Sequence, residues 1–464
     1  MNSKLRHIVL ATMAGSLFSG MSSYAVADST VDLVQALISK GVLTEEEGAL
    51  LTKGRTNEVE ADKKASKNKV KVASFIDNAT VYGDMRARYE RRSGEDTADV
   101  DETRTRGRYK LVLGVKTEAN DWYSDIALSM GVRGRSDNAT FGSGNNGENT
   151  KETVYVKRAM LGWSATDWLK LEAGRMANPL YTTAMVWDAD LTLEGLVEKV
   201  DFKTGNINWF GNFVQSQYRG DRQDFSDNTA DRATNNILAF QGGAKFDITD
   251  TVSAKAALTF TKYTNRHTSG ASTFTPGLGT ASGGGAVVGA NAFATNDLRT
   301  IEIPAELGFK LANNMKLNVF GDYVTNLDGD DRFDAAVANA GANAAALRAA
   351  GNDDKAWMLG VGLGMQQGKA PQKGDWSARI WYQDVGVYAL DQNAVDSDFM
   401  DSRVNMKGIV FKAEYLFRDN VFINFAAGHA KRKNSDLAAI GSNYDVNLNL
   451  DKYDLYQMDV TYKF

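Results

Sequence analysis

The chain has 464 residues, of which 43% are hydrophobic and 24% are charged, and it contains no cysteine. The lack of cysteine excludes disulfides, thiol catalysis and cysteine-ligated metal sites. A net charge of -5 argues against nucleic acid as a partner. With 43 glycines and only 4 prolines, the composition favours many strands and long loops, because proline cannot donate to a sheet ladder.

Residues 1–27 have the pattern of a secretory signal peptide. Lys4 and Arg6 form a basic start, residues 8–18 are apolar, and a small-residue cleavage site ends at Ala27. Cleavage there leaves 51 basic against 58 acidic residues, a net charge of -7. No run of 18 apolar residues follows, so we expect no membrane-spanning helix, although a barrel can hide its hydrophobicity by alternation.

Residues 28–75 differ from the rest of the chain. Apolar residues recur at helical spacing from Val31 to Ile38, and Thr44 followed by three glutamates resembles a capping box that opens a second short helix. A lysine-rich connector follows. We predict a small periplasmic helical, coiled-coil-like segment with a linker; a disordered leader with transient helix is the alternative.

Residues 76–464 form the predicted barrel, and from Ala79 onward the hydrophobic period is two. One face of 104–116 is basic and the other apolar, and the last segment, Tyr456 to Phe464, alternates in the same way. Apolar side chains on one face and polar ones on the other suit a barrel wall between lipid and water. An edge strand of a soluble β-protein is the alternative for a single segment. We therefore predict an all-β fold, a transmembrane antiparallel β-barrel of about 16 strands.

The connections between these segments alternate in length, which is typical of outer-membrane barrels with short periplasmic turns and long outer loops. Within one long loop, 335–351, alanines and Arg348 favour a short helix. Short turns are predicted near 118–121, 166–167, 203–206, 249–250, 313–314, 368–374 and 418–420, and long loops near 92–102, 136–152, 177–192, 218–234, 266–298, 328–353, 389–402 and 433–451.

Several motifs resemble the putative-porin family of proteobacterial outer-membrane β-barrels. The matching residues are the helical element from Leu33 to Glu47 and the stretch from Gly174 to Leu196, with its Gly-Arg-Met, Trp-Asp-Ala-Asp and Glu-Gly-Leu sequences. The resemblance covers essentially the whole mature chain. It implies a water-filled pore and a homotrimer, but it names no solute.

A series of basic side chains falls on the predicted inward face of the first strands. Every second residue of 104–110 is basic, and adjacent guanidinium groups form a row of planar donors that suits carboxylate or phosphate groups. The alternative is that acids such as Glu90 and Glu172 pair with these arginines, so that the row only stiffens the wall. The predicted pore-lining ladder consists of Arg86, Arg88, Arg104, Arg106, Arg108, Lys110, Arg133, Arg158 and Arg175.

The long loop 177–192 is the predicted constriction of the pore. If it folds inward, it sets carboxylates opposite the basic ladder and creates a transverse field that orders polar solutes. An ordinary extracellular loop is the alternative. The constriction candidates are Tyr181, Trp187, Asp188, Asp190 and Glu194.

Enzyme and metal sites have little support in the residues. A hydrolase could use His429 with Ser435 and Asp436, but nearness in sequence is not triad geometry. Two histidines after the signal give too few metal ligands. The acidic loop around Asp328 and Asp334 lacks the full calcium-loop spacing. We expect no catalysis, no cofactor and no metal.

The predicted function is that of an outer-membrane porin for passive diffusion of small hydrophilic solutes or ions, with anion preference as one option. The alternatives are a structural barrel plugged by or sheathing a partner protein, and an outer-membrane hydrolase. The expected partners are outer-membrane lipid, lipopolysaccharide, small solutes and two further copies of the chain, without nucleic acid.

Overall fold

The computed structural model describes residues 76–131, 136–142, 151–219, 235–264, 298–339, 344–368, 370–437, 439–441, 445–446 and 450–464. The predicted signal peptide, residues 1–27, and the predicted helical segment, residues 28–75, lie outside them. The chain divides into two units. The smaller takes in Met1–Tyr82 and Val115–Tyr123, and the larger takes in Gly83–Gly114 and Ser124–Phe464.

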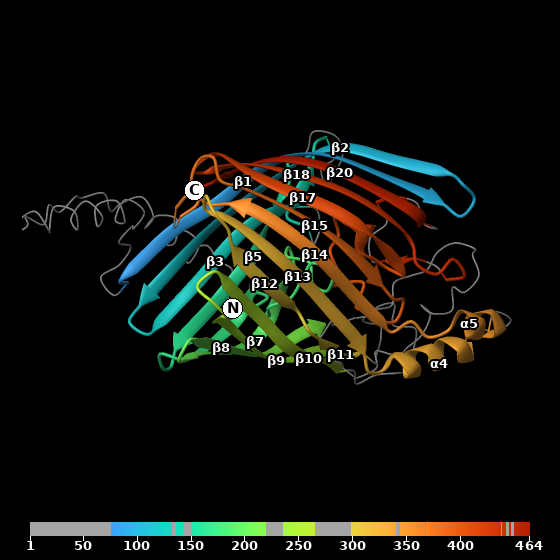
Figure 1. Ribbon diagram of the computed structural model, residues 1–464, viewed down its shortest axis with the longest axis horizontal. Helices are drawn as coiled ribbons and strands as arrows, with labels where there is room; N and C mark the ends of the chain where they lie inside the picture. Colours follow the sequence, from blue (N-terminus) through green and yellow to red (C-terminus); the bar gives the residue numbers. More distant parts are fainter. Residues whose placement is uncertain are drawn as a thin grey trace, which may run out of the picture. The chain divides into compact units, whose positions relative to one another are not determined.

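The described residues form an 18-stranded sheet whose neighbouring strands pair antiparallel (Figure 1). The strands are β1 (Asn78–Asp96), β2 (Asp101–Ala119), β3 (Trp122–Gly131), β4 (Asn138–Thr140), β5 (Thr153–Ser164), β6 (Leu169–Ala177), β7 (Thr192–Thr204), β8 (Ile207–Arg219), β9 (Asn235–Asp247), β10 (Val252–Thr264), β11 (Arg299–Glu302), β12 (Ala305–Lys310), β13 (Met315–Asn326), β14 (Lys355–Met365), β15 (Trp376–Val385), β17 (Met406–Arg418), β18 (Val421–Arg432) and β20 (Leu450–Lys463).

Two pairs of these strands each occupy a single position in the wall. Both β3 and β4 pair with β2, and both β11 and β12 lie between β10 and β13. The second break falls at Pro304, which cannot donate a ladder hydrogen bond. In the described ranges the wall is thus a closed antiparallel barrel of 16 strands, as predicted.

The sheet of the larger unit closes where its first and last strands meet. β1 pairs with β20 from Asp84↔Lys463 to Asp96↔Leu450. At one end of this seam the backbone amide of Gly83 donates to the carbonyl of Phe464 at 2.9 Å, and the amide of Phe464 donates back at 3.1 Å. Closure leaves these strands without unpaired edges.

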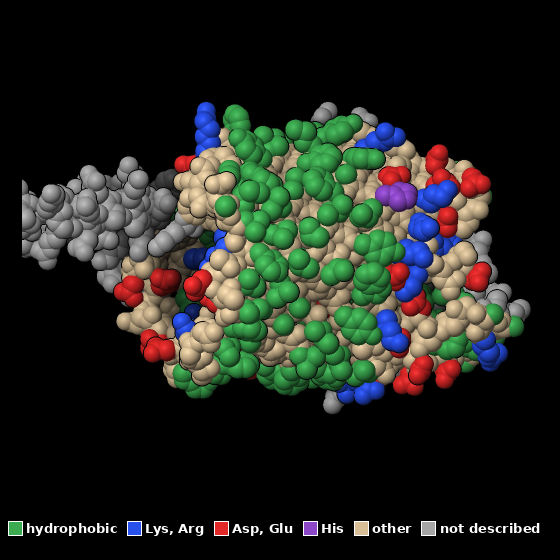
Figure 2. Space-filling model, viewed as in Figure 1, with side chains coloured by type: hydrophobic (Ala, Val, Ile, Leu, Met, Phe, Trp, Pro, Cys, Tyr) green, Lys and Arg blue, Asp and Glu red, His purple; other side chains and the backbone are tan. Residues whose placement is uncertain are grey.

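Side chains alternate between two faces along the strands. In β20, Met458 and Val460 are 53% and 46% exposed, whereas Gln457 and Asp459 between them are 4% and 5% exposed. The outward face therefore carries the apolar side chains and the inward face the polar ones, the reverse of a soluble sandwich. Figure 2 shows hydrophobic side chains over the middle of one outer face, with charged side chains toward both ends of that face.

The larger unit also contains elements outside the wall. Helices α4 (Gly329–Asn339) and α5 (Ala344–Ala350) lie in one long loop, so the predicted helix near 335–351 is confirmed. A short 3-10 helix, η3 (Met400–Ser402), precedes β16 (Arg403–Val404), which pairs with β19 (Ile440–Gly441). No helix among the described residues is long and apolar enough to cross a membrane.

The main hydrophobic core lies inside the barrel. Residues of the segment 386–402, including Val387, Leu390 and Phe399, pack with Trp381 of β15 and Val410 of β17. Trp381 is 5% exposed and Val410 is 1% exposed. The interior is therefore partly filled by the chain itself rather than by water alone.

Candidate functional site

The segment 178–191 crosses the barrel interior. It leaves the wall early, because β6 has only nine residues. The amide of Tyr181 donates to Oε1 of Gln241 on β9 at 2.8 Å. The hydroxyls of Thr182 and Thr183 donate to Glu302 of β11 at 2.5 Å and Asp322 of β13 at 2.6 Å. These three wall side chains are buried on inward faces, so the segment narrows the lumen.

A second inward segment, 386–402, meets the first. The amide of Asp188 donates to the carbonyl of Ala394 at 2.6 Å, and the amide of Asp396 donates to the carbonyl of Ala184 at 3.1 Å. The amide of Ser397 donates to Oδ2 of Asp188 at 3.1 Å. Burial, followed by the charges of Asp396 and Asp190, raises the pKa of Asp188 to about 6.

Sequence reasoning placed residues 389–402 of this second segment among the long outer loops. A usable signal was present, because Gly386-Val387-Tyr388-Ala389-Leu390 continues an apolar run beyond the end of β15. An apolar run in a connection indicates that the connection is buried. Val387, Tyr388 and Leu390 are 3%, 1% and 2% exposed.

Arg88 is a central member of the predicted ladder and is deeply buried. Its Nε lies 2.7 Å from Oδ1 of Asp459 on β20, and its Nη1 lies 3.0 Å from Asp398 of the second inward segment. Arg92 also contacts Asp398 at 3.0 Å and Glu90 at 3.2 Å. Although burial opposes ionisation, Arg88 and Arg92 hold the pKa of the Asp398 carboxyl well below its usual range.

Neighbouring arginines of β2 join the same network. Arg106 contacts Glu90 and Asp445, each at 2.5 Å, and Arg104 also pairs with Asp445. Arg108 lies 3.8 Å from Glu90. Burial opposes ionisation of Asp445, but Arg92 and Arg106 lower its pKa. The guanidinium groups are therefore largely balanced by carboxylates that they touch.

Arg92 is the residue of this network that sequence reasoning missed. It was assigned to the start of a long loop at 92–102, whereas β1 continues to Asp96. The alternation of Arg86, Arg88, Glu90 and Arg92 was the available signal, since one face of a strand repeats every two residues.

Other ladder members have separate partners. Arg86 lies 3.5 Å from Asp459, Lys110 lies 3.4 Å from Asp84, and Arg158 lies 2.8 Å from Asp125. These contacts place all three on inward faces with buried or half-buried carboxylates. Arg133 lies outside the described residues.

The predicted inward positions of Arg175 and Glu194 are wrong. They pair with each other across β6 and β7, where their side chains form an ion pair that is largely exposed. The adjacent pair, Met176 and Leu193, is buried inside the barrel. Because side chains alternate, Arg175 and Glu194 point outward. Within the constriction segment, Trp187 packs against the interior clusters, and the amide of Asp190 donates to Asp188 at 2.9 Å.

A hollow in the lumen lies beside the first inward segment and has a volume of about 590 Å³. We call it the lumen hollow. Residues 181–184 contribute to its lining, together with inward side chains of β12, β13, β15 and β17. Its charged residues are Glu306, Lys316, Arg379 and Lys412, three basic groups against one acidic group.

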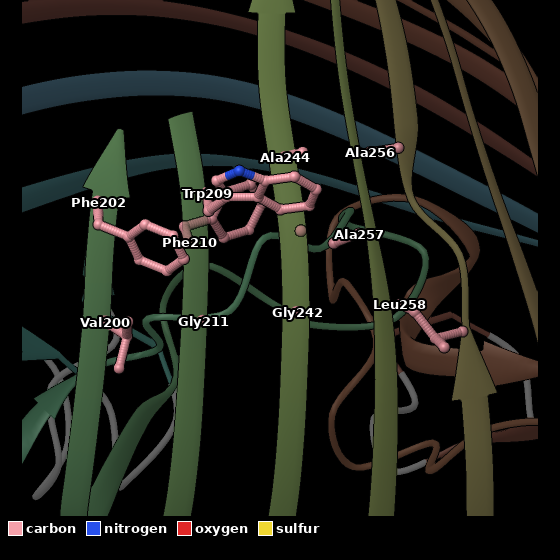
Figure 3. A pocket seen from close by; sticks show the side chains of 11 residues that line it. Val200, Phe202, Trp209, Phe210, Gly211, Gly242, Ala244, Ala256, Ala257 and Leu258 are labelled. Carbon is pink, nitrogen blue, oxygen red and sulfur yellow. The ribbon is translucent and has the colours of Figure 1, made fainter. Parts of the chain in front are cut away.

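A second hollow, of about 430 Å³, has a different character. It is open and lies where small residues interrupt the large apolar side chains, between Trp209 and Leu258 (Figure 3). Gly211, Gly242 and Ala244 contribute to its floor. With no charged side chain in its lining, it offers nothing to bind a hydrophilic solute.

The candidate enzyme and metal residues are also located. His429 Nδ1 lies 2.8 Å from Asp454 Oδ1 on neighbouring strands, and both side chains are largely exposed. The ion-pair partner of Asp328 is Arg299, so that carboxylate belongs to an ion pair of the loop. Among the residues that the structure describes, no cluster of three or more His, Asp or Glu side chains could hold a metal ion.

Comparison with known proteins gives one family match. A family model described as "Putative porin" matches residues 91–282 and 290–464. Comparison with curated protein sequences finds no match.

Solved structures with similar backbones include three bacterial outer-membrane proteins. An anion-selective porin from Comamonas acidovorans is 10% identical, with a TM-score of 0.45 over 83% of this chain and 99% of that chain. The outer membrane channel DcaP of Acinetobacter baumannii is 11% identical, with a TM-score of 0.42 over 83% and 97%. Pseudomonas putida OprB is 8% identical, with a TM-score of 0.49 over 83% and 94%.

Proposed function

The chain belongs to the putative-porin family of the outer membrane, and we propose from this premise that its lumen passes small hydrophilic solutes by diffusion, with a preference for anions. The family and the closed barrel indicate a channel rather than an enzyme. In this proposal the segments 178–191 and 386–402, which contact each other inside the barrel, together narrow the path.

The observation that carries this function is the position of segment 178–191. Hydrogen bonds from Tyr181, Thr182 and Thr183 fasten it to three different wall strands. A loop held at several points inside a wide barrel limits the size of the solutes that pass. Tyr181, Trp187, Asp188 and Asp190 are accordingly the residues that we propose for the constriction.

In this proposal the arginines of the basic ladder mainly hold the inward segments in place. Arg88 is bound to three carboxylates and Arg106 to two, so they hold the inward segments and contribute less to the lumen potential than their formal charges. Arg104 is 42% exposed and remains accessible to ions in the lumen. The interaction of mobile ions with these groups is screened by salt.

Support for anion preference comes from the lumen hollow rather than from the ladder alone. Its lining includes three basic side chains and one acidic side chain. A passage lined by one sign of charge raises the local concentration of counter-ions. The hollow therefore favours anions on the path beside the constriction.

Single-channel recording tests the function directly. Purified protein in a planar bilayer under a KCl gradient is expected to give ohmic conductance steps. The reversal potential is expected to lie between zero and the equilibrium potential of chloride. A reversal potential on the potassium side would reject the anion preference and keep the pore. A protein that is folded and inserted but gives no conductance would reject the pore itself.

The homotrimer implied by family resemblance is a separate proposal. Chemical cross-linking of the full chain in detergent and in outer-membrane fragments is expected to stop at three copies. A product that stops at one copy in both settings would contradict it. Processing after Ala27 and the periplasmic segment 28–75 likewise remain predictions, which mass spectrometry of the mature protein and protease accessibility can check.

A further inference from the structure

We propose that the lumen hollow is a binding site for a small organic monoanion with a planar or apolar body. Its carboxylate would lie between Arg379 and Lys412, and its body against Phe320. This site rests on the proposed function, because the ligand reaches it through the pore.

Two like charges face each other in this hollow. Arg379 of β15 and Lys412 of β17 are directly opposite in the antiparallel register. Like charges in this position repel each other, and the arrangement is destabilising unless an anion lies between them. A neutral residue at either position would remove this repulsion. Because both positions are basic, a carboxylate bound between them would offset the repulsion.

The two cations are only partly neutralised by the protein. Lys412 lies 3.8 Å from Asp396 of the second inward segment. Arg379 packs near the ring of Trp381, at 6.0 Å, and within the described ranges no carboxylate lies within ion-pair distance of it. Its side chain is exposed to the lumen. A guanidinium group presents two parallel donors, which match the two oxygens of a carboxylate.

An apolar surface adjoins these cations. The rings of Phe320 and Trp381 meet edge to face, with centroids 6.3 Å apart. Trp381 is held in place, because its Nε1 donates to Oε1 of Gln383 at 3.0 Å. Trp381 is 5% exposed, and both Arg379 and Lys412 lie near its ring, so the partly buried ring of Phe320 is the main surface left for the ring of an aromatic acid.

On the inward face of β14, Gly362 and Gly364 place no side chain in the hollow, while Met358 of the same face contributes to its lining. Gly362 of β14 pairs with Arg379 on one side and with Asn318 on the other, and Gly364 follows two residues later. A Cβ atom added at Gly362 would lie 3.5 Å from Cβ of Arg379, within the hollow. The glycines therefore leave space that a larger side chain would occupy.

The surrounding charges favour one negative charge on the ligand. The hollow contains Lys316 in addition to the two facing cations, while Glu306 lines it and Asp396 approaches Lys412. Three basic groups and two carboxylates give the site a net charge of +1, which one negative charge on the ligand would balance. A volume of about 590 Å³ lies in the range of pockets that bind small organic molecules.

Benzoate is the probe for this site, with acetate and benzylamine as matched probes that lack the ring or carry the opposite charge. Each is added to the full-length protein in a planar bilayer, and the block of the KCl current is recorded. We expect benzoate to block at concentrations at which acetate and benzylamine do not. Equal effects of benzoate and acetate would overturn the apolar part of the site.

Variants of the residues that line the lumen hollow test whether benzoate blocks the current by binding there. Arg379→Gln and Lys412→Gln are each expected to raise the half-blocking concentration of benzoate by roughly tenfold, as loss of one charge-assisted contact predicts. Gly362→Val is expected to do the same without removing a charge. Lys431→Gln is the control, because that lysine is exposed on the outer face of β18. Unchanged block in all three variants would overturn the site.

Failure of this inference can be told from failure of the proposed function. Ohmic KCl conductance without benzoate block would overturn the site and leave the pore. If no conductance is seen, titration calorimetry of the detergent-solubilised protein with benzoate tests the site by itself. A heat of binding that is lost in Arg379→Gln and kept in Lys431→Gln supports the site. Absence of binding overturns it.

Discussion

Arg88 and Asp398 are 310 residues apart in the sequence and form a 3.0 Å ion pair inside the barrel. This contact ties the segment 386–402 to the wall strand β1. Arg92 makes a second contact with the same carboxylate at 3.0 Å. The segment is thus fixed by a buried charge network as well as by apolar packing.

Replacing Asp398 with Asn is therefore expected to destabilise the protein. The change leaves Arg88 and Arg92 buried with one fewer carboxylate, and removal of one partner from a buried pair costs about 3–5 kcal/mol. Thermal or urea unfolding followed by circular dichroism measures the loss. Glu95→Gln is the matched control, because its pair with Lys452 is exposed and screened by solvent, so its loss is expected to change the stability much less. Equal effects of the two variants would contradict the network.

The junction between the two inward segments is expected to weaken as the pH rises. The pKa of Asp188 is raised from 3.8 to about 6 by burial and by the charges of Asp396 and Asp190, while Lys412 faces Asp396. A carboxyl with a raised pKa contributes its full stability below the unfolded value of 3.8. That contribution is lost as the pH rises through about 6. A shift of two units corresponds to on the order of 3 kcal/mol.

Open-channel current noise in bilayers at pH 5 and pH 7.5 measures this effect, with larger noise expected at the higher pH. In Asp188→Asn the difference is expected to shrink, because the neutral amide carries no charge at either pH. Noise that depends on pH as strongly in the variant as in the original protein would assign the effect to other groups.

Removal of the threonine hydroxyls that bind segment 178–191 to the wall is expected to widen the constriction. Thr182→Val and Thr183→Val together delete the hydroxyls that donate to Glu302 and Asp322, while they keep the size of the side chains. Two carboxyls on the wall lose a donor, so the segment 178–191 is held less firmly. Passage of larger neutral sugars in a vesicle-swelling assay should increase. An unchanged size limit would remove these hydroxyls from the pore mechanism.

Exposed Arg104 and its largely buried neighbour Arg106, which share the carboxylate of Asp445, are expected to influence ion preference. Changing Arg104 and Arg106 to Gln leaves the carboxylate of Asp445 without two of its cationic partners. The local potential becomes more negative, so the reversal potential in a KCl gradient should move toward potassium. A reversal potential that stays constant at low salt, where screening is weakest, would exclude these arginines from selectivity.

A pair of neighbouring residues tests which face of β20 meets lipid. Val460 is 46% exposed on the outward face, whereas Thr461 is 6% exposed on the inward face. Val460→Lys places a charge in the hydrocarbon region and is expected to cost about 2–4 kcal/mol near the midplane. Thr461→Lys leaves the lipid face intact. Urea unfolding in vesicles should show the larger loss for Val460→Lys, and the opposite order would reverse the faces.

The sequence by itself determined the features that depend on local alternation. The period of two from residue 76 onward predicted the strands, their antiparallel order and the inward faces of Arg86, Arg88 and Arg108, because successive side chains of a strand point to opposite sides. The alanine-rich stretch at Ala344–Ala350 predicted a helix for an equally local reason, its intrinsic propensity.

Only the tertiary structure decided which loops fold inward and what the arginines touch. Alternation carries no information about a connection, so 386–402 was not distinguished from the other long loops. For Arg175 and Glu194, the sequence predicted inward positions, which were wrong, because the adjacent pair Met176 and Leu193 is the one buried inside. Contacts such as Arg88 with Asp398 join residues far apart in the chain, and only closure of the barrel brings their strands and loops together.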